Sequence, residues 1–287
     1  MEFGVRQCII GGAVLILSFP VLGSWAAEQR SSFENKLRNV DLCNGADRSL
    51  PEPQINGCTA LIDAGNETTL LLAIAHNNRG NAYSAKADYD RAIKDYDLAI
   101  KLNPTYAKPF NNRGVAYHKK GEYDRAIENF DEAIKLSPNY GNAFANRAET
   151  YQKKHDYERA ARDYDDAIRL EPNLEAAWNG RCWARAIIGQ LQAALTDCNR
   201  ALHIKPNDAA TYDSRGLTYL KMGQFDSAIE DYSSALRFEP KHASALYGRG
   251  LAKLKKGDAA GGNADLAAAK AIKATIADDF ARYGVRL

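Results

Sequence analysis

Five prolines recur along the chain at a constant spacing, and this spacing limits the possible folds more than any other feature. Pro104, Pro138, Pro172, Pro206 and Pro240 are each 34 residues apart. A fixed period of this length indicates stacked supersecondary units, each contacting only its neighbours. The chain is therefore expected to form a row of repeats and not one compact core.

Small and large side chains alternate within each repeat at fixed places. We number each repeat so that the proline is position 32. Positions 8, 20 and 27 are small, and position 20, for example, is Ala92, Ala126, Ala160, Ala194, Ala228 and Gly262. Aromatic residues recur at positions 11, 17 and 24, spaced so that they share one helix face. Close approach at small residues, with rings filling the space beside them, predicts two antiparallel helices per repeat.

The turns carry their own signals. Gly121, Gly189, Gly223 and Gly257 stand at position 15, where they end the first helix of their repeats. The proline at position 32 stops the second helix before the next repeat begins. Each repeat is thus predicted to be helix, tight turn, helix, turn.

This pattern resembles the tetratricopeptide repeat family. The resemblance covers six units in phase, at residues 73–106, 107–140, 141–174, 175–208, 209–242 and 243–273. Repeat four departs from the pattern at Cys182, Arg185 and Cys198, and repeat six lacks the proline. The resemblance implies an all-α fold, a right-handed superhelical solenoid of helix-turn-helix repeats.

Both ends of a stack need a cover, because a terminal repeat exposes an apolar face. At the N-terminal end, residues 27–72, Ile55 to Ala64 is predicted as a helix that packs on repeat one, after a polar segment containing Pro51 and Pro53. At the C-terminal end, residues 274–287, a cap helix is predicted at 274–283.

Residues 1–26 have the layout of a secretory signal, with an apolar stretch from Cys8 to Gly23. Ser24 and Ala26 favour cleavage before Ala27, and a retained anchor is the alternative. We therefore expect an exported protein, in a bacterial periplasm, with no membrane attachment after cleavage.

Four cysteines remain after cleavage. In an oxidising compartment we expect Cys43 to pair with Cys58, and Cys182 with Cys198. The alternative for the second pair is two buried free thiols that act as small apolar residues. The cysteine and histidine spacings match no zinc site, so no metal is expected.

Position 7 is an arginine in all six repeats, where the family usually has leucine. Position 23 is an acid in five of them, for example Asp95 and Asp163. We expect each arginine to pair with the carboxylate of the facing helix, since a partly buried charge needs a partner. The alternative is a row of arginines that binds an anion.

Charge and motifs exclude several classes of function. The chain has 38 Lys plus Arg against 36 Asp plus Glu, interleaved, for a net charge of +2, so nucleic acid is not an expected partner. No catalytic motif is present, and neither an enzyme nor a small-molecule cofactor is expected. The resemblance implies an extracytoplasmic adaptor or scaffold that binds a peptide or partner protein on its concave face. A structural subunit of an envelope assembly, or an accessory subunit of an exported enzyme, is the alternative.

In this family the first helix of each repeat lines the inner groove. Its inner positions are rich in asparagine in the first four repeats: Asn77, Asn78, Asn81, Asn111, Asn112, Asn142, Asn146 and Asn179. Amides donate and accept at once, so such a row can hold the backbone of an extended peptide. Farther along, the same face turns apolar and could take hydrophobic anchors: Trp183, Leu217, Leu220, Tyr247 and Leu251. The alternative is that asparagines are simply tolerated on a solvated helix surface, and that the apolar half packs on the C-terminal cap or on neighbouring helices.

Overall fold

The computed structural model describes residues 21–45 and 50–285. Within these ranges the chain forms fifteen α-helices and no strand. Most of the predicted signal peptide, residues 1–20, lies outside the described residues. None of the described helices is both long enough and apolar enough to cross a lipid bilayer.

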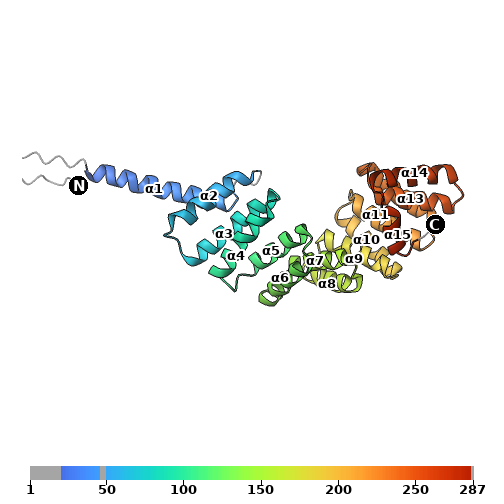
Figure 1. Ribbon diagram of the computed structural model, residues 1–287, viewed down its shortest axis with the longest axis horizontal. Coiled ribbons are helices and arrows are strands. Elements are labelled where there is room, and N and C mark those ends of the chain that lie inside the picture. The colour runs from blue at the N-terminus through green and yellow to red at the C-terminus, as the bar shows by residue number, and fades with distance from the viewer. Residues whose placement is uncertain (1–20, 46–49, 286–287) are drawn as a thin grey trace, which may run out of the picture.

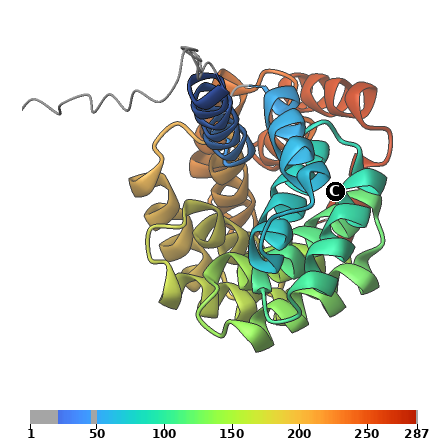
Figure 2. The same ribbon diagram turned by 90° about the vertical axis from the view of Figure 1, so that its left-hand side faces the viewer.

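Each repeat is a pair of antiparallel helices, as the small and large positions predicted. The first helices are α3 (Thr69–Ala85), α5 (Ala107–Lys120), α7 (Gly141–Lys153), α9 (Glu175–Ile187), α11 (Ala209–Lys221) and α13 (Ala243–Lys255). The second helices are α4 (Tyr89–Leu102), α6 (Tyr123–Leu136), α8 (Tyr157–Leu170), α10 (Leu191–Ile204), α12 (Phe225–Phe238) and α14 (Ala259–Ile272). The repeats follow one another along the long axis (Figure 1), and seen along that axis their helices form a ring (Figure 2).

The first helices lie on the inner side of this superhelix. Along the described chain, each first helix contacts the first helix of the next repeat, as α3 does α5 and α9 does α11, whereas no two second helices of neighbouring repeats touch. Helices converge on the concave side of a curved stack and diverge on the convex side. The first helices therefore line a concave groove.

The two helices of a repeat cross at a residue that has no side chain. A Cβ on Gly80 would lie 2.6 Å from Cε1 of Tyr96, which is buried, so only glycine lets the ring fill the crossing. Repeat four closes the same crossing with the predicted disulfide between Cys182 and Cys198, whose Cα atoms are 5.4 Å apart. Glycine with a ring, and cystine, are thus two solutions to one packing problem.

The arginines at position 7 pair with the facing helix as predicted, and they also bond to a second partner in the preceding repeat or cap. Within five of the six repeats, the guanidinium donates to both oxygens of the facing carboxylate at 2.7–2.9 Å: Arg79–Asp95, Arg147–Asp163, Arg181–Asp197, Arg215–Asp231 and Arg249–Asp265. In repeat two, Arg113 donates to the amide oxygen of Asn129 at 2.7 Å. The remaining Nη1 reaches back to the previous repeat, as from Arg181 to Asp165 at 2.6 Å. The arginines therefore join neighbouring repeats as well as the two helices of one repeat.

The N-terminal cap contains a helix that the sequence did not predict. The predicted cap helix extends as α2 over Pro51–Ala64 and so includes Pro51 and Pro53, and before it α1 spans Val21–Cys43, starting within the predicted signal region. The predicted disulfide between Cys43 and Cys58 ties α1 to α2, and α2 packs on α3. In Figure 1, α1 extends outward from this end of the stack.

The C-terminal cap is α15 (Ile276–Arg282), which turns back from α14 to lie beside α13. Ile276 and Phe280 are buried. The ring of Tyr283, just after the helix, stands edge-on to Trp183 of α9, with centroids 5.1 Å apart. The cap therefore reaches back along the groove as far as repeat four.

Candidate functional site

Five asparagines from the first three repeats form a continuous hydrogen-bonded row, which we call the asparagine ladder. Between repeats, Asn146 donates to Asn111 at 2.9 Å and Asn112 donates to Asn77 at 3.0 Å. Within repeats, Asn111 donates to Asn112, and Asn77 to Asn78, each at 3.1 Å. The rule is simple: position 6 of one repeat donates to position 5 of the repeat before it.

The ladder continues beyond the residues that the sequence predicted. Asn78 donates to Asn44 of the N-terminal cap at 3.3 Å. Asn44 was missed, although it precedes Asn78 by one period of 34 residues. On the other side, Asn81 accepts from Asn112 and from the hydroxyl of Tyr96, both at 2.9 Å.

Exposure differs along the row. Asn77 and Asn111 are buried, Asn78, Asn112 and Asn146 are half-buried, and Asn81 and Asn142 are exposed. Each amide has two N–H groups and two lone pairs on oxygen, so the one to three ladder bonds that each makes leave hydrogen-bonding capacity toward the groove. The ladder thus combines fixed amide orientations with unused donors and acceptors.

The ladder stops at repeat four, because the donor of the next repeat is missing. Position 6 becomes Gly180, Ser214 and Gly248 in the last three repeats, and Ser214 donates instead to a backbone carbonyl of its own helix. The acceptors that these residues would have met, Oδ1 of Asn179 and Oδ1 of Asp213, are buried without a hydrogen-bond partner in the part of the chain that the structure describes.

A hollow of about 400 Å³ opens beside Asn179, between α7, α9 and α11. Asn142 and Asn146 also line it, together with the carboxylates of Glu149, Glu175 and Asp208. The sequence predicted the asparagines and missed the acids, which come from three different repeat positions. We call this feature the acidic hollow.

The carboxylates of the acidic hollow differ in environment. The hydrogen bond from His118 lowers the pKa of Glu149. Burial, and then the nearby charge of Asp208, raise the pKa of Glu175. Burial opposes ionisation of Asp208, but hydrogen bonds from Lys205 and Thr211 outweigh it and lower the pKa of that carboxyl.

The apolar half of the predicted surface is not open. Leu217, Leu220, Tyr247 and Leu251 are buried in one cluster with Ile276 and Phe280 of α15, and Trp183 packs against that cluster. Partner binding by these five residues therefore stays a prediction. In this structure they pack on the C-terminal cap, as the alternative expectation has it.

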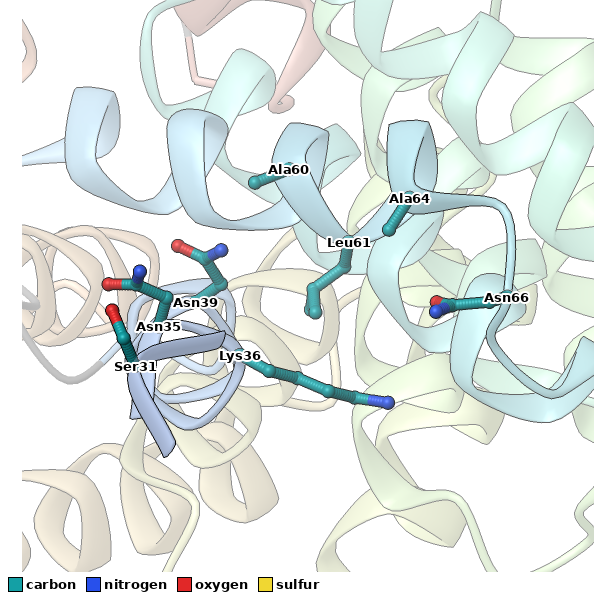
Figure 3. Close-up of a pocket in the computed structure, with 8 residues that line it drawn as sticks. All are labelled: Ser31, Asn35, Lys36, Asn39, Ala60, Leu61, Ala64 and Asn66. Atoms are coloured by element: carbon teal, nitrogen blue, oxygen red, sulfur yellow. The ribbon is translucent and has the colours of Figure 1, made fainter. Parts of the chain in front are cut away.

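A second hollow, of about 500 Å³, lies at the N-terminal cap. Figure 3 shows its walls: polar side chains of α1 on one side, and Ala60, Leu61 and Ala64 of α2 on the other. Lys36 extends from α1 toward the turn after α2, where its ammonium pairs with Glu67 at 2.7 Å. We assign this hollow to the packing of the cap.

In the two described ranges no three His, Cys, Asp or Glu side chains come together as metal ligands. The chemistry of the groove is that of amides and carboxylates, which bind by hydrogen bonds and charge.

Comparisons with known proteins agree with this architecture. Family models described as tetratricopeptide repeat match residues 107–140, 146–209 and 129–162, and one described as TPR repeat matches residues 80–121 and 216–257. The comparison with curated proteins gives no match.

Solved structures show the same fold at low sequence identity. YrrB, a TPR protein with an unusual peptide-binding site, is 24% identical, with a TM-score of 0.55 over 67% of this chain and 97% of its own. A tetratricopeptide repeat protein from Parabacteroides merdae is 18% identical, with a TM-score of 0.64 over 89% of this chain and all of its own. PilW, a type IV pilus biogenesis factor, is 18% identical, with a TM-score of 0.63 over 70% of this chain and 93% of its own.

The family matches together span more than half of the chain, and they fall on the helix pairs described above. Proteins of this family mediate protein–protein interactions through such stacks. Helix pairs, period and family models lead to one assignment: the chain belongs to the tetratricopeptide repeat family.

Proposed function

We propose that this protein is an adaptor that binds an extended segment of a partner protein in the N-terminal half of its groove. The observation that carries the proposal is the asparagine ladder, which lies on the inner helices of repeats one to three. Fixed amides with spare donors and acceptors suit the backbone of an extended peptide, whose N–H and C=O groups alternate along its length. The peptide-binding site named for YrrB is in keeping with this role.

The C-terminal half of the groove contributes differently. Because α15 and Tyr283 cover its apolar residues, a partner segment meets the amides of the first repeats and stops at the cap. Binding along the ladder would therefore depend on backbone hydrogen bonds more than on large apolar anchors.

Site-specific photo-crosslinking tests the proposal without breaking the ladder. Alanine at Asn112 would leave the buried Asn77 without its donor, so loss of binding would be confused with loss of stability. A photo-reactive residue at Asn142, which is exposed on α7 and outside the ladder, avoids this problem. The matched control is the same residue at Leu98, which is 42% exposed on the outer helix α4.

We expect crosslinked partner protein from position 142 and none from position 98. Crosslinks only from position 98 would refute the proposal and favour a subunit held in an envelope assembly by its convex face. Mass spectrometry of the crosslinked product identifies both the partner and the segment that lies in the groove.

We also infer that the protein acts outside the cytoplasm. The signal-like residues 1–26 and the two disulfides support export. The expected mature chain begins at Ala27, within α1, and would be found in the periplasmic fraction. Intact mass of the protein purified from its own cells shows whether residues 1–26 are cleaved, and recovery of the protein in the cytoplasmic fraction would contradict the proposal.

A further inference from the structure

The acidic hollow at the end of the asparagine ladder has the features of a specificity pocket. It adjoins Asn146, the last member of the ladder, so a segment bound along the ladder would reach it. About 400 Å³ is enough room for one long side chain. The groups that line the hollow decide which side chain can bind in it.

The lining is rich in acceptors, while three of its amides already use one N–H group each. Asn146 donates to Asn111, and Asn142 donates to Glu171 at 3.4 Å. Gln152 donates to the carbonyl of Gly180 at 2.8 Å. Among the described residues, the buried Oδ1 of Asn179 has no hydrogen-bond partner, because Ser214 has replaced the ladder donor. A ligand that brings donors therefore fits this lining better than one that brings acceptors.

The charge of the hollow is negative. Glu149 has His118 near it, at 3.4 Å, and Asp208 has Lys205, at 2.6 Å. Glu175 has no ion-pair partner among residues 21–45 and 50–285. Within these ranges the one hydrogen bond to its carboxylate comes from the hydroxyl of Thr211, at 3.2 Å. A partly buried carboxylate without a cation favours a ligand that supplies one.

We propose that the acidic hollow binds a basic side chain, arginine or lysine, of the partner segment that lies on the ladder. The cation pairs with the carboxylate of Glu175. Arginine fits best, since its planar fork serves both oxygens of a carboxylate together. This inference rests on the proposed function, because the ladder holds the segment that delivers the side chain.

A random peptide library displayed on phage tests this directly, with the purified mature protein as bait. We expect enriched peptides to share one basic residue at a fixed place. With Glu175→Gln as bait, which keeps the size of the side chain, that preference should fall about tenfold while other features of the peptides remain. The matched control is Glu128→Gln, at a glutamate on the outer helix α6.

One enriched peptide, synthesised with arginine or with its uncharged analogue citrulline, gives the affinity by calorimetry. The arginine form should bind about tenfold more tightly. Peptides enriched without a basic residue would overturn the inference and leave the proposed function standing. Enrichment of a free N-terminal amine in place of a side chain, or an unchanged preference with Glu175→Gln, would overturn the assignment. If no peptide is enriched at all, both proposals fail together.

Discussion

The first three repeats and the last three are built on the same frame and differ in what fills the groove. In repeats one to three, amide side chains bond across the repeats, and Asn78, Asn112 and Asn146 remain in contact with solvent. In repeats four to six, the inner helices carry apolar residues, mostly at other positions than the ladder, and these lie under α15. The difference teaches that one helix stack can be an open surface at one end and a closed core at the other. Which of the two forms depends only on the side chains that the first helices present to the groove.

The largest expected effect is in the closed half. Phe280 is 1% exposed and its ring lies 4.8 Å from that of Tyr247. Phe280→Ala should destabilise the protein by about 4 kcal/mol, through lost burial and the cavity left behind. Urea unfolding measures the loss, and the fluorescence of Trp183 should change with it. The control is Phe238→Ala, since Phe238 is 43% exposed on α12.

If both substitutions have the same small effect, α15 is not the closing element of this half. The apolar residues would then be available to a partner, and the contrast between the two halves would disappear.

The second prediction concerns Asp213, the unpaired acid of the closed half. Burial raises the pKa of this carboxyl to about 6, and Glu239 adds to the shift while His242 and Ser244 oppose it. The folded state therefore holds the proton more tightly than the unfolded state, whose carboxyl has an ordinary pKa. Protonation of Asp213 therefore stabilises the folded state fully at low pH, and this stabilisation is lost as the pH rises through about 6.

Asp213→Asn removes that titration. The variant should match the parent protein near pH ~4.5 and exceed it near pH ~7.5, by on the order of 2 kcal/mol. Thermal unfolding at both pH values measures the difference. A gap between variant and parent that does not change with pH would contradict the buried, unpaired state of Asp213.

The open half should respond less to the loss of one side chain. Asn112→Ala removes the donor to Asn77 and Asn81, and the expected cost is about 1–2 kcal/mol because the oxygen of Asn77 is buried. Asn142→Ala, at an exposed amide outside the ladder, should cost less than about 0.5 kcal/mol. Equal costs for the two would mean that the ladder bonds add nothing to stability.

Much of the frame could be predicted because each of its parts repeats. The proline period, the glycine at the turn and the Arg–Asp pairs recur every 34 residues, so each is supported by several copies. Both disulfides could be predicted from an even number of cysteines in a chain that was expected to be exported. The asparagines were found for the same reason, since amides recur at two positions of successive repeats.

What could not be predicted depends on contacts that occur once. The seven-residue α15 was expected as a cap, but only its turn back beside α13 buries Tyr247 and Leu251. The acidic hollow brings together Glu149, Glu175 and Asp208, which stand at three different repeat positions. No period marks such a set, so only the structure shows it.

The smallest effects should be equal in the two halves, because they come from the shared frame. Position 15 has a positive φ in every repeat, including the two non-glycine residues Ala87 (58°) and His155 (62°). Gly121 in the open half and Gly223 in the closed half have φ of 79° and 73°, and nothing lies near the place that a Cβ atom would occupy. Gly121→Ala and Gly223→Ala should each cost about 1 kcal/mol, for backbone strain alone.

The reverse change, Ala87→Gly, should relieve that strain. We expect it to stabilise the protein by about 0.5–1 kcal/mol, after the greater freedom of glycine in the unfolded chain is counted. Urea unfolding of the three variants beside the parent protein measures these shifts. Unequal costs at Gly121 and Gly223 would show that the two halves differ in their backbone frame as well as in their groove. Equal costs, together with the unequal effects expected at Phe280 and Asn112, would locate the difference in the inner side chains alone.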